Sequence, residues 1–162
     1  MTALRIFKPA ILPLAIVASG LALAACSMGG GGGTAIALAP GLAARMDQPG
    51  ASLDRAQAIA MINAYRATSG LPALTPDAAL DGTAQALATQ YAQTGTPPRA
   101  PQDLTVMKLS AGYATFAETF SGWRNSPADA VALKATATKA GVAVAFNPTS
   151  TYGVHWVLVL DE

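Results

Sequence analysis

Residues 141–160 read GVAVAFNPTSTYGVHWVLVL, and this stretch decides the fold. Residues 141–146 alternate large and small side chains, whereas residues 154–160 are almost continuously apolar. Both patterns predict β-strands, and the turn-forming residues 147–153 between them predict an antiparallel hairpin. Because a strand that is apolar on both sides is usually covered on both sides, helical layers are expected on the two faces of a sheet.

Two helices are predicted upstream, one on each side of Gly70. The first begins after the cap sequence Ser52-Leu53-Asp54, carries apolar residues at helical spacing and stops at Gly70. The second opens at Thr75-Pro76-Asp77, with a cap residue, a proline at the first helical position and an acid in the first turn, and it ends near Gly95.

Two shorter helices are predicted between these and the hairpin. They begin at Thr115-x-x-Glu118 and Ser126-x-x-Asp129, which have the pattern of capping boxes. The proline-rich residues 96–101 form a loop, and residues 106–113 are a candidate for a further strand. The predicted fold class is therefore α/β, a three-layer α-β-α sandwich with a small, mainly antiparallel sheet.

Four aromatic side chains are predicted to form the core. Phe116, Phe120 and Trp123 recur at i, i+4 and i+7, and Trp156 lies in the last strand. Helix and strand faces with this spacing normally pack inside a domain. The alternative is an apolar groove for a lipid or a peptide.

The N-terminus has the features of a lipoprotein signal peptide. Arg5 and Lys8 precede an apolar run that stops at Leu23-Ala24-Ala25-Cys26, and Cys26 is the only cysteine in the chain. An ordinary transmembrane helix is the alternative, but two prolines interrupt the segment, and its apolar core is shorter than the roughly 20 residues that a span needs. We expect residues 1–25 to be removed and Cys26 to be lipidated.

The expected domain organisation follows from this cleavage. Residues 26–52 form the lipidated cysteine and a flexible glycine-rich tether, and residues 53–162 form one domain. Loss of Arg5 and Lys8 reduces ten basic residues to eight, against nine acidic ones, so the net charge becomes −1. This balance argues against a nucleic-acid partner. The membrane, reached through Cys26, is the expected partner.

The chain resembles the CAP superfamily, also called SCP-like domains, the family of cysteine-rich secretory, antigen 5 and pathogenesis-related proteins. The resemblance covers residues 55 to 160. It begins at residues 60–74, AMINAYRATSGLPAL, and continues through Gly112-Tyr113, Trp123-Arg124-Asn125-Ser126-Pro127, Gly141-Val142-Ala143-Val144 and Tyr152-Gly153-x-x-Trp156. It implies an α-β-α sandwich, whereas the location in the cell envelope is expected from the lipoprotein signal.

The resemblance also implies a central cleft, which in several members of the family binds a divalent metal through two histidines and two acids. This chain departs from that pattern. Met107 stands where bacterial relatives have glutamate, Asp129 stands where they have histidine, and residues 95–106 supply no histidine. His155 is the remaining imidazole, so the cleft candidates are His155, Asp129, Met107 and Tyr113. One imidazole does not make a usual zinc site, and we expect no metal or other cofactor.

Two functions compete on this reasoning. The first is a non-catalytic, lipid-anchored envelope domain that binds a lipid-like small molecule or a protein partner, as some members of the family bind sterols or fatty acids. The alternative is a metal-dependent hydrolase or protease that uses His155 and Asp129. A Ser-His-Asp triad could be assembled from Ser110, Ser126 or Ser150, but no Gly-x-Ser-x-Gly turn exposes a nucleophile. No catalytic residue is therefore predicted.

The expected location is the outer membrane, facing the periplasm or the cell surface. Ser27 after Cys26 indicates this by resemblance to proteobacterial lipoproteins.

Overall fold

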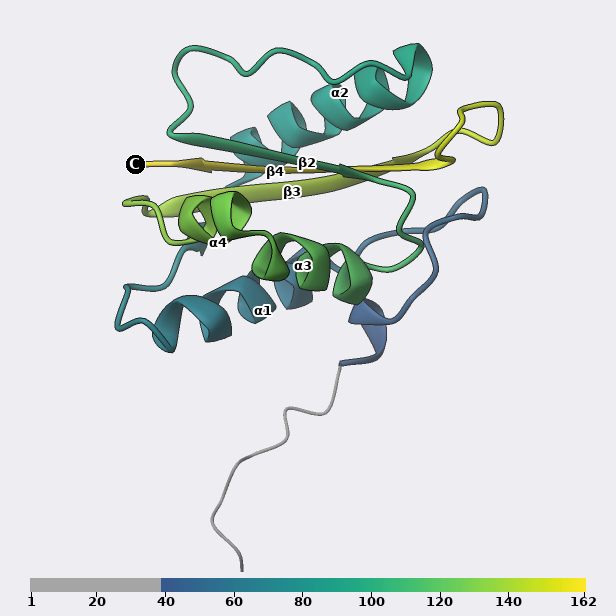
Figure 1. Cartoon of the computed structure of the whole chain (residues 1–162). Helices are drawn as coiled ribbons and strands as arrows, with labels where there is room; N and C mark the ends of the chain where they lie inside the picture. Colours follow the sequence, from purple (N-terminus) through teal and green to yellow (C-terminus); the bar gives the residue numbers. More distant parts are fainter. Residues whose placement is uncertain (1–38) are drawn as a thin grey trace, which may run out of the picture. The chain divides into compact units, whose positions relative to one another are not determined.

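The computed structural model describes residues 39–162, which belong to one packed unit. The predicted signal peptide and Cys26 lie outside the described residues. The elements, in chain order, are a 3-10 helix η1 (Pro40–Leu42), α1 (Arg55–Ala67), β1 (Thr75–Pro76), α2 (Ala78–Thr94), β2 (Val106–Ala111), α3 (Phe116–Asn125), α4 (Pro127–Leu133), β3 (Lys139–Phe146) and β4 (Val154–Asp161) (Figure 1).

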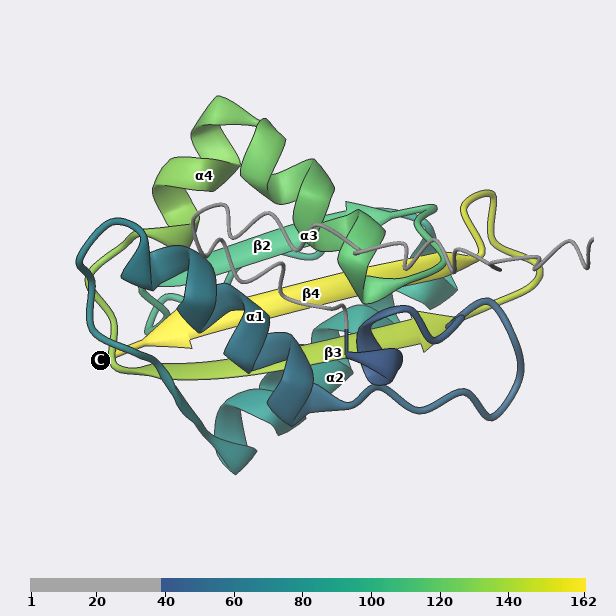
Figure 2. The same cartoon turned by 90° about the horizontal axis from the view of Figure 1, so that it is seen from below.

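The four strands form one sheet in the order β1-β3-β4-β2. β3 and β4 are an antiparallel hairpin, β2 runs antiparallel to β4, and the short β1 runs parallel to β3. Helix α2 covers one face of the sheet, and α1, α3 and α4 cover the other (Figure 1). Figure 2, which looks onto this second face, shows α1, α3 and α4 in front of the strands. The predicted α/β three-layer sandwich is confirmed.

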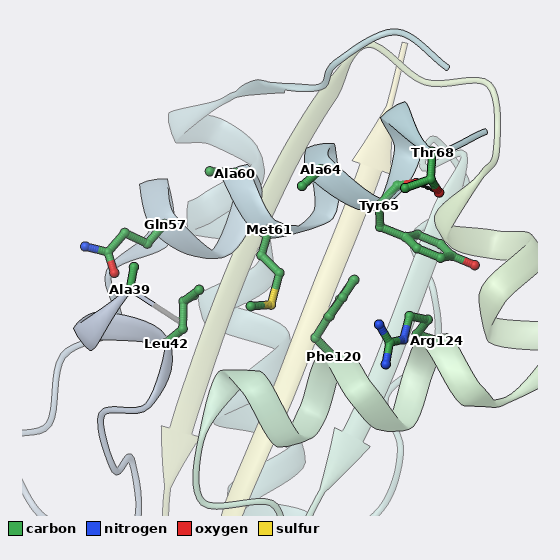
Figure 3. A pocket seen from close by; sticks show the side chains of 10 residues that line it. All are labelled: Ala39, Leu42, Gln57, Ala60, Met61, Ala64, Tyr65, Thr68, Phe120 and Arg124. Atoms are coloured by element: carbon green, nitrogen blue, oxygen red, sulfur yellow. Dashed lines mark hydrogen bonds between the residues drawn. The ribbon is translucent and has the colours of Figure 1, made fainter. Parts of the chain in front are cut away.

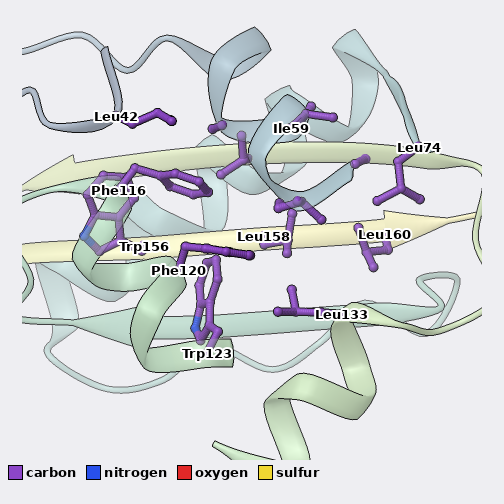
Figure 4. Packing of buried hydrophobic residues seen from close by; sticks show 14 of the residues in the cluster. Leu42, Ile59, Leu74, Phe116, Phe120, Trp123, Leu133, Trp156, Leu158 and Leu160 are labelled. Atoms are coloured by element: carbon purple, nitrogen blue, oxygen red, sulfur yellow. The ribbon is translucent and has the colours of Figure 1, made fainter. Parts of the chain in front are cut away.

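The hydrophobic core has two parts because β4 sends alternate side chains to opposite faces. Trp156, Leu158 and Leu160 pack with α1, α3 and α4 (Figure 4), whereas Val157 and Val159 pack with α2. Every residue of β4 from Val154 to Leu160 is buried, as its continuous apolarity predicts. The four aromatic side chains Phe116, Phe120, Trp123 and Trp156 are also buried, which confirms their predicted place in the core.

The helix starts follow the sequence in part. Asp54 caps α1 by accepting from the backbone N–H of Gln57, and Thr115 and Glu118 form the predicted capping box of α3. The predicted start of α2 at Thr75 is wrong. Thr75 and Pro76 pair with β3 as a strand, and Asp77 caps the helix by accepting from the backbone N–H of Leu80. A nonlocal parallel pairing therefore takes the two residues that local signals assign to the helix start.

The capping role predicted for Asp129 is also wrong. Ser126 precedes α4 but its side chain makes no cap hydrogen bond. The carboxylate of Asp129 instead forms an ion pair with the ammonium group of Lys108 on β2. Asp129 thus joins α4 to the sheet.

Gly141 allows α2 to lie directly on β3. A Cβ atom at this position would be 2.2 Å from the carbonyl carbon of Leu80 and 2.4 Å from the backbone nitrogen of Asp81. Backbone atoms cannot move aside as the end of a flexible side chain can. Glycine is therefore required by the close approach of two backbones.

Polar side chains from α1 and α2 meet the outer edge of β3 where β1 ends. The backbone N–H of Val142 donates to Asp81, and its carbonyl accepts from Nε of Arg55. Nε2 of Gln85 donates to the carbonyl of Val144. Side chains thus satisfy backbone groups that a neighbouring strand would otherwise bind.

Arg66 is a fully buried cation at the end of α1. Its guanidinium donates to four backbone carbonyls, those of Pro72, Leu133, Ala135 and Ala137, at 2.9 to 3.4 Å. Arg66 therefore ties the loop after α1 to the connection between α4 and β3.

The packed unit begins well before the expected start at residue 53. Leu42 in η1 and Met46 are buried in the larger core cluster, and the backbone N–H of Met46 donates to the carbonyl of Ala114. Residues 39–52 are therefore not the flexible tether that their low content of large side chains predicts. Within residues 39–162, no helix combines the length and hydropathy needed to cross a membrane.

Candidate functional site

His155, the histidine predicted to face a cleft, is fully buried on the α2 face of β4. Its ring packs edge-on against Tyr91 of α2, with ring centroids 4.5 Å apart. Nε2 lies 2.7 Å from the hydroxyl oxygen of Ser150 in the loop between β3 and β4. Burial lowers the pKa of His155 below its ordinary value, so the ring is neutral near neutral pH.

Asp129 lies on the opposite face of the sheet from His155. Its partner Lys108 pairs with Leu158 in the β2–β4 register, and Leu158 belongs to the core under α1 and α3. His155 points to the other side, toward α2. The four-stranded sheet therefore separates the two side chains that a shared metal or acid–base site would need together.

Met107 and Tyr113 do not join His155 either. Met107 is half-buried and packs against the α2-side core near Val159, four residues along β4 from His155. Tyr113 is exposed, lies against Gly122 of α3, and its backbone carbonyl accepts from Nε1 of Trp156. The four cleft candidates thus occupy separate places on the domain.

No group of three or more His, Cys, Asp or Glu side chains in the described part of the chain is arranged to hold a metal ion. A structural zinc site needs four such ligands and a catalytic one needs three. The geometry of residues 39–162 therefore offers no metal centre around His155.

Ser150 and His155 form one part of the triad considered from the sequence. A hydroxyl beside an imidazole can act as a nucleophile when a third group orients the ring. Nδ1 of His155 is buried and has no hydrogen-bond partner within residues 39–162. Asp129, the acid proposed for that role, lies beyond the sheet, so the described residues hold a Ser–His contact and no triad.

The buried imidazole makes stability depend on pH. The unfolded chain gains a proton on its one histidine below about pH 6.5, whereas the folded chain resists protonation because burial lowers the pKa of His155. The contribution of His155 to the free energy of unfolding should therefore be fully present above about pH 6.5. The free energy of unfolding should fall as the pH drops below this value, by at most about 1.4 kcal/mol per pH unit.

Urea titrations at pH 7.5 and 5.5 measure this loss. The matched control is His155→Gln, which has no group that titrates in this range. If the variant loses as much stability as the parent between the two pH values, the dependence does not come from His155.

An apolar depression lies elsewhere, between α1 and α3. It has a volume of ≈ 400 Å³. Figure 3 shows the side chains that line it from η1, α1 and α3. They are Ala39, Leu42, Gln57, Ala60, Met61, Ala64, Tyr65, Thr68, Phe120 and Arg124. We call this depression the α1–α3 groove.

The polar groups of the α1–α3 groove lie at its two ends. Gln57 lies at the end near Ala39, and its Oε1 accepts from the backbone N–H of Gly41. Thr68 and Arg124 lie at the other end, beside the phenol of Tyr65 (Figure 3). The wall between the ends is apolar, and no acidic side chain lines the groove.

Sequence reasoning missed the position of this groove, although one signal was present. Helix α1 has a core stripe that includes Ile59, Ile62 and Arg66. A second stripe of small and apolar residues runs beside it at spacings of three and four, through Gln57, Ala60, Met61, Ala64, Tyr65 and Thr68. Such a stripe shows that a second surface of α1 is apolar, but it does not identify α3 as the opposite wall.

Comparison with known proteins finds a matching family and solved structures with the same fold. The model of the CAP, or cysteine-rich secretory protein, family matches residues 59–160. Among solved structures, the chain is similar to MpPR-1i soaked with selenourea, at 22% identity over 64% of this chain and 86% of that chain, with a TM-score of 0.53. It is also similar to an outer surface protein from Borrelia burgdorferi, at 20% identity over 64% and 89% of the two chains, with a TM-score of 0.51. A search of the curated proteins found no match. At these identities the structural likeness shows the fold alone.

Proposed function

The chain belongs to the CAP, or cysteine-rich secretory protein, family, and on this premise we propose that it is a non-catalytic member that binds a lipid-like ligand. The ligand lies in the α1–α3 groove, on the face of the sheet opposite His155 and Met107. This location differs from the cleft near Met107 that the sequence favours.

One observation carries the proposal: the α1–α3 groove is an apolar hollow that the domain's own side chains leave open. Its volume of ≈ 400 Å³ falls within the range of about 300–1,000 Å³ typical of small-molecule sites. The small side chains of Ala60 and Ala64 leave space along α1. Met61 contributes a flexible apolar contact surface and Phe120 an aromatic one. An apolar ligand chain that covers this surface removes it from water, which favours binding by about 25 cal/mol for each Å² of apolar surface buried.

A bulky residue in the α1–α3 groove should prevent binding. Ala64→Trp places an indole in the groove, so we expect the affinity for the fluorescent fatty acid cis-parinaric acid to fall at least about tenfold. The matched control is Ala56→Trp, on the exposed side of the same helix. Fluorescence titration of the purified chain measures both. Equal binding by the two variants, or no binding by the parent, contradicts the proposal.

We also propose that Cys26 anchors this domain to a membrane of the cell envelope, in the outer membrane of a bacterium. The support is the sequence: an apolar segment that ends in Leu-Ala-Ala before the single cysteine. Cys26→Ser should abolish metabolic labelling with a fatty acid and leave the chain unprocessed or released from membranes, because two or more acyl chains hold a protein far more firmly than one. Labelling and fractionation test this, and unchanged membrane partitioning of the variant contradicts the anchor.

The alternative of a metal-dependent hydrolase finds no support in the geometry. His155 and Asp129 are separated by the sheet, and Asp129 is already paired with Lys108. The contact between Ser150 and His155 lacks an orienting partner at Nδ1 within the described residues. The geometry of the described residues therefore supports the proposal of ligand binding better than that of hydrolysis.

A further inference from the structure

Tyr113 is an exposed aromatic residue whose backbone is held on both sides. Its side chain is 42% exposed. Its carbonyl accepts from the indole N–H of Trp156 at 2.9 Å, and the N–H of the preceding Gly112 donates to the carbonyl of Val154 at 2.9 Å. A tyrosine has only two side-chain torsions, so a ring on a backbone fixed in this way loses little conformational entropy when a ligand contacts it.

Gly122 provides the surface on which this ring lies. It occupies the interior of α3, where glycine is less favourable than alanine. A Cβ atom at this position would be 3.1 Å from the hydroxyl oxygen of Tyr113 and 3.2 Å and 3.3 Å from two carbons of its ring. These distances are shorter than ordinary van der Waals contacts, so a methyl group would push the ring away. The glycine therefore lets Tyr113 lie directly against the helix.

A depression of ≈ 520 Å³ lies beside the ring of Tyr113, and its volume is within the range of about 300–1,000 Å³ typical of small-molecule sites. The other residues that line it are Glu118, Ser121, Gly122, Asn125 and Ser126. The first four of these recur at i, i+3, i+4 and i+7 and therefore share one face of α3. The α1–α3 groove takes Phe120 and Arg124 from the same helix, so the two hollows have no lining residue in common.

Polar groups in this depression keep capacity for further hydrogen bonds. The hydroxyl of Ser126 makes no cap bond, and Asn125 uses only Nδ2, which donates to Oγ of Ser121 at 3.4 Å. Oε2 of Glu118 accepts from the backbone N–H and the hydroxyl of Thr115, and Oε1 makes no hydrogen bond within residues 39–162. Among the described residues, no cation lines the depression. The lining therefore suits the hydroxyl groups of an uncharged ligand better than an anion.

We propose that this depression binds a neutral pyranose sugar with equatorial hydroxyl groups, as in the glucose or N-acetylglucosamine units of a glycan. Such a sugar presents axial C–H groups on its faces, and their partial positive charge is attracted by the negative face of an aromatic ring. Tyr113 supplies the ring, while the hydroxyl of Ser126 and the amide of Asn125 bind the hydroxyl groups of the sugar. The inference goes beyond the proposed lipid binding and does not rest on it.

Saturation-transfer NMR of the purified full chain with chitotriose and cellotriose tests the site, and trigalacturonate is the anionic control of similar size. We expect the two neutral trisaccharides to bind and the anionic one to bind at least about tenfold more weakly. Tyr113→Ala should weaken the neutral sugars about tenfold, whereas Tyr113→Phe, which keeps the ring, should stay within about threefold of the parent. Tyr152→Ala, at an exposed tyrosine outside the depression, should leave binding unchanged.

Two glycine variants separate the position of Tyr113 from effects on folding. Gly122→Ala should weaken the neutral sugars about fivefold while circular dichroism shows a folded chain. The matched control is Gly82→Ala in the interior of α2, where nothing lies within 4 Å of an added Cβ, and it should bind as the parent does. Failure of both neutral trisaccharides to bind, or equal binding by the parent and Tyr113→Ala, overturns the sugar site without affecting the lipid proposal. Tighter binding of trigalacturonate overturns the assignment to a neutral ligand.

Discussion

Trp156→Ala is expected to lower the free energy of unfolding by about 4 kcal/mol, in the range typical of large aromatic side chains in a core. Trp156 is fully buried and contacts Phe116, with ring centroids 5.8 Å apart (Figure 4). Its indole N–H also donates to the backbone carbonyl of Tyr113 at 2.9 Å. Alanine leaves a cavity under α3 and a carbonyl without its donor, and domains of this size have only about 5–15 kcal/mol in total.

Urea denaturation followed by circular dichroism measures this effect. Trp156→Phe is the informative companion, because it keeps most of the ring volume and removes the hydrogen bond. We expect it to cost clearly less than alanine. A small shift of the midpoint in Trp156→Ala, at an unchanged slope, would show that the ring does not support the core.

Arg66→Ala is expected to be comparably damaging, at about 4 kcal/mol, for a different reason. Four carbonyls lose their donor, and the bonds to two of them, Leu133 and Ala137, are buried. Each buried unsatisfied group costs roughly 1–3 kcal/mol unless water reaches it. Removal of the buried charge returns part of this, since its desolvation also disfavours folding. The sum of the lost bonds still exceeds that gain.

Thermal and urea unfolding of three variants resolve the cause. Arg66→Lys keeps the charge but reaches fewer carbonyls, so we expect an intermediate loss. Arg99→Ala, at an exposed arginine, should be within about 0.5 kcal/mol of the parent. If Arg66→Ala were as stable as Arg99→Ala, the carbonyl network would contribute nothing to the fold.

Much of the architecture can be predicted from the sequence because its signals are local. The alternation of residues 141–146 and the apolar run of residues 154–160 predict a hairpin, and the helix caps at Asp54 and Thr115 predict two starts correctly. The strand at Thr75–Pro76 could not be predicted in this way. It exists because Thr75 and Pro76 meet Lys139 and Ala140, more than sixty residues later, and no local pattern reports that pairing.

The candidate site was less predictable, since it depends on register and on the contacts between helices. A cleft that unites His155 with Asp129 requires both on one face. His155 points from β4 toward α2, whereas Asp129 on α4 pairs with Lys108 of β2 on the opposite face. Arg66 reads in the sequence as one more cation on a helix, and its burial becomes evident only when the connection between α4 and β3 folds over it. The α1–α3 groove likewise needs two helices whose neighbourhood the sequence does not state.

The polar side chains bonded to the outer edge of β3 affect how copies of the protein interact. An open strand edge is a template on which a second chain can add its own strand, and successive additions lead to insoluble fibres. Arg55, Asp81 and Gln85 occupy the edge from Val142 to Val144, so an incoming strand would first have to displace charged and amide groups. The same three side chains that join the helices to the sheet therefore protect the protein against self-association where it is concentrated.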